Sequence, residues 1–314
     1  MTTRAIMRGG GGIPGIQRLV AMWRAMAEQG LDGTHLYGNS AGAIVSLIDA
    51  VGHDAQWAWD LMEQLTDDDL RDEVPFWRLR GVIPTTGAMA SLFGRFQVDH
   101  MLRTRKMDAL LEHFAGSRFE IRKPLTVFAT DRSTGEGVEL PVLAQDTCGW
   151  RLNSVGASWA ISGVFPPRQL GGRELTDGGT SNNAALPEQW NQYDEVWLLI
   201  ASGGRDALRP GGSMIANFLR NAWFYGRDQT HDAIRALGLS VQQLQARGWD
   251  TRTIPVYDDG KHGRIVRVHA LWPDFEDRGS LRLCPGLMDQ TYAWAKQALS
   301  EMQQSIATKQ EIPF

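Results

Sequence analysis

The segment Leu36-Tyr37-Gly38-Asn39-Ser40-Ala41-Gly42-Ala43-Ile44-Val45 places one serine between two glycines, where an apolar strand runs into a helix. This G-x-S-x-G pattern is typical of a nucleophile elbow, a sharp turn that strains the serine backbone and exposes its hydroxyl. The two glycines leave room for the strand and the helix to pass closely. Ser40 is therefore a candidate nucleophile, and the alternative is an ordinary turn serine.

The residues before this segment complete a βαβ unit. Arg4-Ala5-Ile6-Met7-Arg8 reads as a short strand, and it ends in the loop Gly9-Gly10-Gly11-Gly12-Ile13-Pro14-Gly15. A helix then follows, because apolar residues recur at helical spacing from Ile16 to Met26 and Gly30 suits its end. Strand, helix and a second strand in this order predict an α/β fold with a parallel sheet.

The glycine loop offers backbone N–H groups near a helix N-terminus, which can bind a phosphate or an oxyanion. Residues 10–15 formally satisfy the dinucleotide pattern G-x-G-x-x-G. However, the second strand has no acidic residue at its end, where a ribose ligand is needed, and none lies closer than Asp32. The sequence favours an oxyanion hole, with nucleotide binding and a purely structural turn as alternatives.

Downstream, an aspartate stands on a second glycine loop. Glu174-Leu175-Thr176 reads as a strand that leads into Asp177-Gly178-Gly179. A carboxylate in this position is free to point at a partner, although Asp-Gly is also a common hairpin turn. The other expected elements are strands at 124–131, 137–140, 196–201, 252–256 and 264–269, and helices at 151–162, 214–238 and 290–306.

Bulk composition limits the possible functions. The chain has 314 residues, a net charge of −4 and two cysteines, Cys148 and Cys284. This charge argues against a nucleic-acid partner, and the cysteines lack metal-ligand spacing. No apolar run reaches the roughly 20 residues that span a bilayer, and no signal peptide is visible. We expect a cytoplasmic protein without metal or cofactor.

Three motifs in this order resemble the patatin-like phospholipases, lipid acyl hydrolases with a Ser-Asp dyad. The loop at 10–15 resembles their G-G-G-x-[KR]-G, residues 38–42 resemble G-x-S-x-G, and Asp177-Gly178-Gly179 resembles D-G-[GA]. The resemblance is clear over about residues 4–200. It implies catalysis by Ser40 and Asp177, an oxyanion hole at Gly10, Gly11, Gly12 and Ala41, and no cofactor.

The resemblance also implies an architecture and a substrate class. We expect one domain over residues 1–314, with three αβα layers and a mostly parallel central sheet. A variable helical cap is expected at 52–118, after the nucleophile helix, and C-terminal helices and late strands at 203–314. Trp77, Phe93 and Phe96 of the cap are candidates for binding an acyl chain, or they pack as an ordinary helical layer. A lipid or other acyl ester is the expected substrate, with transient contact to a membrane surface.

One residue departs from the family pattern. Pro14 stands where the family has Lys or Arg, so it supplies neither an N–H group nor a positive charge. Arg8 or Arg18 could take over that charge. Two other functions stay open: a Ser-His-Asp esterase that uses Asp177 with His262 or His269, and a non-catalytic module that binds lipid or protein.

Overall fold

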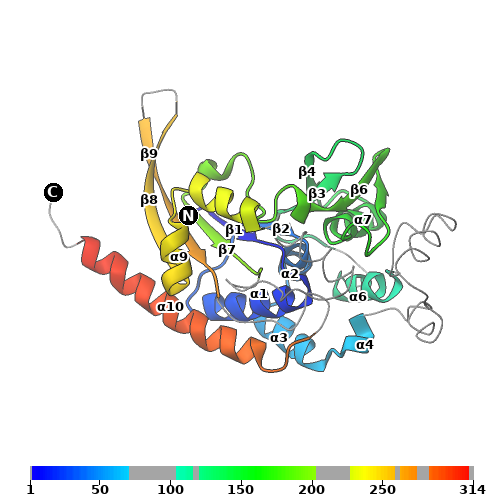
Figure 1. Cartoon of the computed structure of the whole chain (residues 1–314), viewed down its shortest axis with the longest axis horizontal. Coiled ribbons are helices and arrows are strands. Elements are labelled where there is room, and N and C mark those ends of the chain that lie inside the picture. The colour runs from blue at the N-terminus through cyan, green and yellow to red at the C-terminus, as the bar shows by residue number, and fades with distance from the viewer. Residues whose placement is uncertain are drawn as a thin grey trace, which may run out of the picture.

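A mixed β-sheet forms the centre of the computed structural model, which describes residues 2–70, 104–115, 120–202, 227–258, 262–273 and 283–310. Within these residues the sheet has nine strands in the order β5-β6-β3-β2-β1-β7-β9-β8, with β4 also paired to β3 (Figure 1). The strands are β1 (Arg4–Arg8), β2 (His35–Asn39), β3 (Leu125–Asp131), β4 (Gly137–Val142), β5 (Arg168–Leu170), β6 (Arg173–Asp177), β7 (Glu195–Leu199), β8 (Trp249–Asp258) and β9 (His262–Leu271).

The central strands are parallel and the outer ones are antiparallel. β3, β2, β1, β7 and β9 run in one direction. β4 and β6 are antiparallel to β3, and β8 is antiparallel to β9. The carboxyl ends of β1, β2 and β7 therefore lie at the same edge of the sheet, where α/β proteins place their ligands.

Helices cover both faces of the sheet, which gives three layers (Figure 1). One face packs against α1 (Gly12–Ala27), α2 (Ala41–Ala50), α3 (Ala55–Gln64), α6 (Arg105–Ala115), α7 (Cys148–Ser158) and α10 (Leu287–Gln310). The other face packs against helical residues 227–236 and α9 (Val241–Arg247). In β7, for example, Trp197 and Leu199 belong to the first core, whereas Val196 and Leu198 belong to the second.

The expected three-layer α/β architecture is confirmed, and most expected elements lie within a few residues of their predicted bounds. The predicted end of one helix is wrong. α7 stops at Ser158 instead of continuing to residue 162, because the Ser158 carbonyl accepts a hydrogen bond from Ser40 in another element. Within 52–118, the structure describes α3, the short α4 (Asp67–Leu70) and α6. That the whole chain forms one domain stays a prediction.

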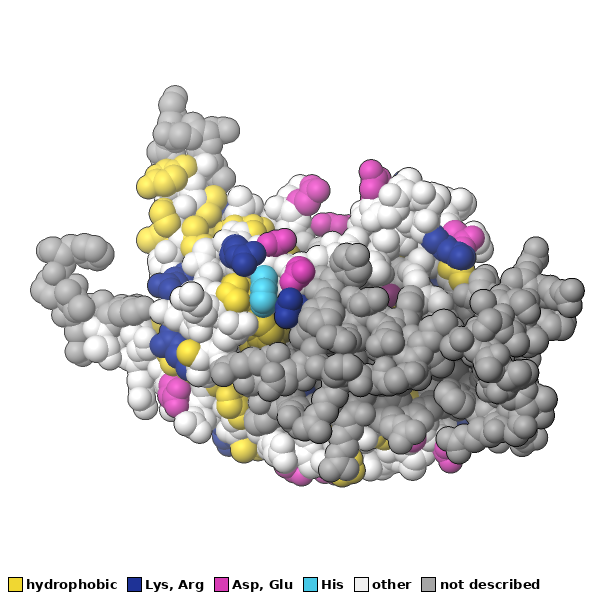
Figure 2. Space-filling view, in the orientation of Figure 1, with side chains coloured by type: hydrophobic (Ala, Val, Ile, Leu, Met, Phe, Trp, Pro, Cys, Tyr) yellow, Lys and Arg dark blue, Asp and Glu magenta, His cyan; other side chains and the backbone are white. Residues whose placement is uncertain are grey.

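β8 and β9 form a long hairpin that extends beyond the body of the molecule (Figure 1). Two large apolar side chains on it are strongly exposed, Tyr257 at 70% and Ile265 at 63%. Hydrophobic side chains accordingly gather on this projection in the space-filling view (Figure 2). α10 runs along α1 and ends below the same hairpin (Figure 1).

Candidate active site

Ser40 lies in a strained turn between β2 and α2. Its backbone has φ 52° and ψ −119°, a conformation that L-residues other than glycine rarely adopt. The Ser40 N–H donates to the Ser158 carbonyl at 3.1 Å and to the Ser158 hydroxyl at 3.0 Å, which fixes the turn against the end of α7. The glycine two residues after the serine is sterically required, since a Cβ on Gly42 would lie 1.8 Å from the Arg8 carbonyl oxygen. These features are those of a nucleophile elbow.

The register of the sheet brings Asp177 beside this serine. Asn39, the last residue of β2, pairs with Phe128 of β3, and the next residue, Ala129, pairs with Asp177 of β6. Ser40 and Asp177 therefore lie on either side of β3. The Ser40 hydroxyl donates a hydrogen bond to the Asp177 carboxylate, and both residues are only 7% exposed.

Burial gives the Asp177 carboxylate the electrostatics of a base. Loss of solvation raises its pKa to about 6, although hydrogen bonds from the Gly179 N–H, at 2.6 Å, and from the Ser40 hydroxyl act in the opposite direction. Removal from water disfavours the charged carboxylate and so increases its affinity for a proton. At neutral pH Asp177 is ionised and faces a hydroxyl that can supply a proton.

The glycine loop lies next to Ser40, and its N–H groups differ in whether they already have a hydrogen-bond acceptor. The Gly9 N–H donates to the Leu199 carbonyl at 3.0 Å, and the Gly10 N–H donates to the Asn183 carbonyl at 2.9 Å. Gly10 was expected to be an oxyanion donor, and this hydrogen bond argues against that role. In the described part of the chain, the N–H groups of Gly11, Gly12 and Ala41 have no acceptor. These three amides are the ones available to bind an anion.

Neither arginine that could compensate for Pro14 points its charge at Ser40. Arg8 is fully buried, pairs with Asp49 at 2.7 Å and lies over the Trp23 ring. Arg18 is also fully buried and donates to the Ala201 carbonyl at 3.0 Å. Positive potential beside Ser40 therefore comes from backbone amides at the N-termini of α1 and α2.

Sequence reasoning missed two asparagines of this region. Asn39 is completely buried, and neither its Oδ1 nor its Nδ2 has a hydrogen-bond partner among the described residues. Asn183 holds Gly10 through its carbonyl, and its side-chain Nδ2 donates to Thr230. Both side chains pack against Gly10. A Cβ at that position would lie 2.6 Å from Asn183 Oδ1 and 3.1 Å from Asn39 Nδ2, so only glycine fits there. The sequence signal that could have pointed to this region is the position of Asn39 inside the G-x-S-x-G motif.

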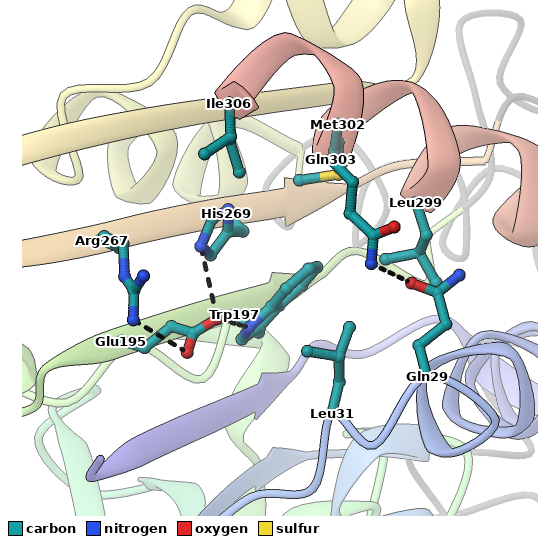
Figure 3. A pocket seen from close by; sticks show the side chains of 10 residues that line it. All are labelled: Gln29, Leu31, Glu195, Trp197, Arg267, His269, Leu299, Met302, Gln303 and Ile306. Atoms are coloured by element: carbon teal, nitrogen blue, oxygen red, sulfur yellow. Dashed lines mark hydrogen bonds and ion pairs between the residues drawn. The ribbon is translucent and has the colours of Figure 1, made fainter. Parts of the chain in front are cut away.

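The histidines proposed for a Ser-His-Asp triad lie elsewhere. His269 stacks on Trp197, its Nδ1 is 2.9 Å from the Thr251 hydroxyl, and its Nε2 is 3.4 Å from the Glu195 carboxylate (Figure 3). His262 starts β9 and pairs with Asp258 at the far end of the hairpin. Among the described residues, no histidine contacts Ser40 or Asp177, which argues against the triad.

Three further expectations concern the residues that bind an acyl chain, a metal ion and a membrane-spanning helix. Trp77, Phe93 and Phe96 lie outside the described residues. The described residues contain no group of three or more His, Cys, Asp or Glu side chains placed to hold a metal ion. In the same part of the chain, no helix combines the length and apolar character needed to cross a membrane.

The motif order and this geometry can be compared with known proteins. A family model described as patatin-like phospholipase matches residues 7–188, which is more than half of the chain. The chain belongs to the patatin-like phospholipase family. The resemblance inferred from the three motifs is thus confirmed, and membership of this family supports a lipid acyl hydrolase at the family level. A comparison with curated proteins finds no match.

Solved structures of longer proteins are similar to this patatin-like phospholipase over 97% of its chain. VipD from Legionella pneumophila is 17% identical with a TM-score of 0.46, and the match covers 67% of that chain. Human GIVD cytosolic phospholipase A2 is 12% identical with a TM-score of 0.48 and 59% coverage. The type III effector protein ExoU is 14% identical with a TM-score of 0.37 and 53% coverage. These likenesses are too distant to bear on substrate or activity.

Proposed function

We propose that this patatin-like phospholipase cleaves carboxylic esters of lipids through a dyad of Ser40 and Asp177. The observation that carries the proposal is the hydrogen bond from a serine in a strained elbow to a buried carboxylate whose pKa is raised to about 6. A nucleophile and a base in contact are the basic requirement for covalent acyl transfer.

The first half-reaction forms an acyl-enzyme. Ser40 Oγ attacks the ester carbonyl carbon while its proton moves to the Asp177 carboxylate. The bond between that carbon and the leaving alkoxide then breaks, and Asp177 returns the proton to the alkoxide, which leaves as an alcohol. Ser40 now carries the acyl group as an ester.

The second half-reaction uses water in place of the alcohol. Water attacks the acyl carbon and gives its proton to Asp177, and the Ser40–acyl bond breaks with return of the proton to Ser40 Oγ. A carboxylic acid and the free enzyme result. Both tetrahedral intermediates place negative charge on the former carbonyl oxygen, and the N–H groups of Gly11, Gly12 and Ala41 are proposed to bind it.

A panel of p-nitrophenyl esters and phospholipids tests this proposal. Ser40→Ala and Asp177→Asn are each expected to lower kcat/KM by at least about a thousandfold, since members of a catalytic unit are each essential. Ser133 and Asp131 provide matched controls: their side chains are hydrogen-bonded at 2.6 Å at and just after the end of β3, and the hydrogen bonds from Ser133 hold the pKa of Asp131 below its usual value. Ser133→Ala and Asp131→Asn should retain activity.

Covalent labelling separates this proposal from a non-catalytic module, the alternative suggested by Pro14. A fluorescent phosphonate is expected to label the wild-type protein and the Ser133→Ala control, but not Ser40→Ala. Absence of labelling in the folded wild-type protein would contradict the hydrolase proposal and support a binding role. Equal labelling of Ser40→Ala would show that another residue is the nucleophile.

A further inference from the structure

A cavity lies at the opposite edge of the sheet from Ser40. Ser40 follows the carboxyl end of β2, whereas the cavity is next to Glu195, the first residue of the parallel strand β7. α10, the turn after α1 and strands β7 and β9 enclose it (Figure 3). Its volume is about 110 Å³. An engineered apolar cavity of ~150 Å³ binds benzene, so this space suits a short alkyl chain.

The walls of this cavity have two chemically different halves. Leu31 and the α10 residues Leu299, Met302 and Ile306 form a mainly apolar half, in which Gln303 and Gln29 are hydrogen-bonded to each other at 2.9 Å. Glu195, Arg267 and His269 form a polar half, with the Trp197 ring between the two (Figure 3). A ligand that fills the cavity must therefore be amphiphilic.

Hydrogen bonding in the polar half favours an anion. The Glu195 carboxylate accepts from Trp197 Nε1 at 2.8 Å and from two nitrogens of Arg4, at 2.8 and 3.1 Å. It is only 6% exposed and so has little capacity left for a ligand. Arg267 lies farther away, at 3.9 Å, and its side chain is 50% exposed. Its guanidinium is thus only partly neutralised and offers N–H donors to an incoming carboxylate.

We propose that this cavity binds a short aliphatic carboxylate. The carboxylate binds Arg267 at the mouth of the cavity, and the alkyl chain lies between Trp197 and the apolar residues of α10. Charge complementarity selects the carboxylate over an alcohol, and it rejects an amine. The site is separate from the Ser40 region, so its occupancy does not depend on the proposed hydrolysis.

Isothermal titration with hexanoate, hexanol and hexylamine tests the proposal on the full chain. Hexanoate is expected to bind at least tenfold more tightly than hexanol, and hexylamine should not bind. Arg267→Gln is expected to weaken hexanoate at least tenfold and to leave hexanol unchanged. Arg264→Gln is a matched control, because Arg264 lies on the same strand, outside the cavity lining, and binds the Gln192 carbonyl.

A second variant tests the apolar half independently. Ile306→Trp should fill the space beside α10 and abolish binding of both hexanoate and hexanol, while the melting temperature stays near that of the wild type. Unchanged hexanoate affinity in Arg267→Gln, or binding of hexylamine as tight as that of hexanoate, would overturn the proposal. Loss of ester hydrolysis in Ser40→Ala with intact hexanoate binding keeps the two proposals distinguishable.

Discussion

Asp177 must be ionised to accept the Ser40 proton, and its pKa of about 6 therefore sets an acid limb for catalysis. We predict that kcat/KM for an uncharged ester is constant above pH 7 and falls about tenfold for each pH unit below 6. The pH profile of p-nitrophenyl ester hydrolysis measures this directly. An acid limb near pH 4 would mean that Asp177 does not act as the base in its observed environment.

The same raised pKa predicts how Asp177 affects stability. In the unfolded chain the Asp177 pKa returns toward 3.8, so folding becomes less favourable as pH rises from about 4 to 6. The ionised side chain then costs the folded state about 3 kcal/mol. Asp177→Asn keeps an acceptor for the Gly179 N–H and removes the charge. Urea unfolding should show a more stable variant at pH 8, and the gain should disappear at pH 4.

At this scale, sequence patterns predicted the serine and the aspartate but not their surroundings. Ser40 and Asp177 lie in short motifs, G-x-S-x-G and D-G-G, that identify a candidate nucleophile and a candidate base from the sequence alone. The hydrogen bond from Gly10 to Asn183 joins residues far apart in the chain, and only the folded sheet brings them together. The same holds for Asn39, whose carboxamide lies against Gly10 and against Gly178, two glycines from distant parts of the sequence.

The first turn of α2 depends on the absence of a side chain at Gly42. Gly42→Ala places a methyl group 1.8 Å from the Arg8 carbonyl oxygen, where neither backbone can yield. We predict a loss of about 4 kcal/mol or more in the free energy of unfolding, measured by urea denaturation.

Gly149 is the matched control for this prediction. It is also the second residue of its helix, α7, but a Cβ there meets nothing within 4 Å. Gly149→Ala is expected to raise stability by up to about 1 kcal/mol. Equal effects of the two substitutions would contradict the close approach between α2 and β1.

Elements with strong apolar periodicity were predicted well, and short or polar ones were not. β1, β3 and β7 are mainly apolar runs that are almost continuously buried, and α10 buries apolar residues at helical spacing. β5 has three residues and owes its existence to pairing with β6, so no local pattern marks it. The late strands were expected, but their union in a hairpin that leaves Tyr257 exposed follows from tertiary structure.

Glu195 connects three strands of the sheet and therefore matters to the whole molecule. It contacts Arg4 of β1, Trp197 of its own strand and His269 of β9. Burial raises the Glu195 pKa, but the hydrogen bonds from His269, Arg4 and Trp197 outweigh it and bring the pKa to about 2. A depressed pKa stabilises the fold above the unfolded value of about 4.5, and this stabilisation is lost as pH falls toward 2.

We predict that Glu195→Gln lowers the free energy of unfolding by about 3 kcal/mol at pH 7. The difference from the wild type should narrow below pH 4.5, because the wild-type carboxylate then gains a proton as well. Urea unfolding at several pH values measures this. A difference that is independent of pH would show that the loss comes from packing and not from charge.

The contacts of the glycine loop also set the order in which a newly made chain becomes competent. Gly9 is held by the Leu199 carbonyl and Gly10 by the Asn183 carbonyl, although both glycines are synthesised near the start. During translation Ser40 is synthesised long before Asp177 and before β7, the strand whose Leu199 carbonyl fixes the glycine loop. On the proposed mechanism, a chain interrupted before β7 cannot hydrolyse an ester, so activity appears only after residue 199 has been synthesised and folded.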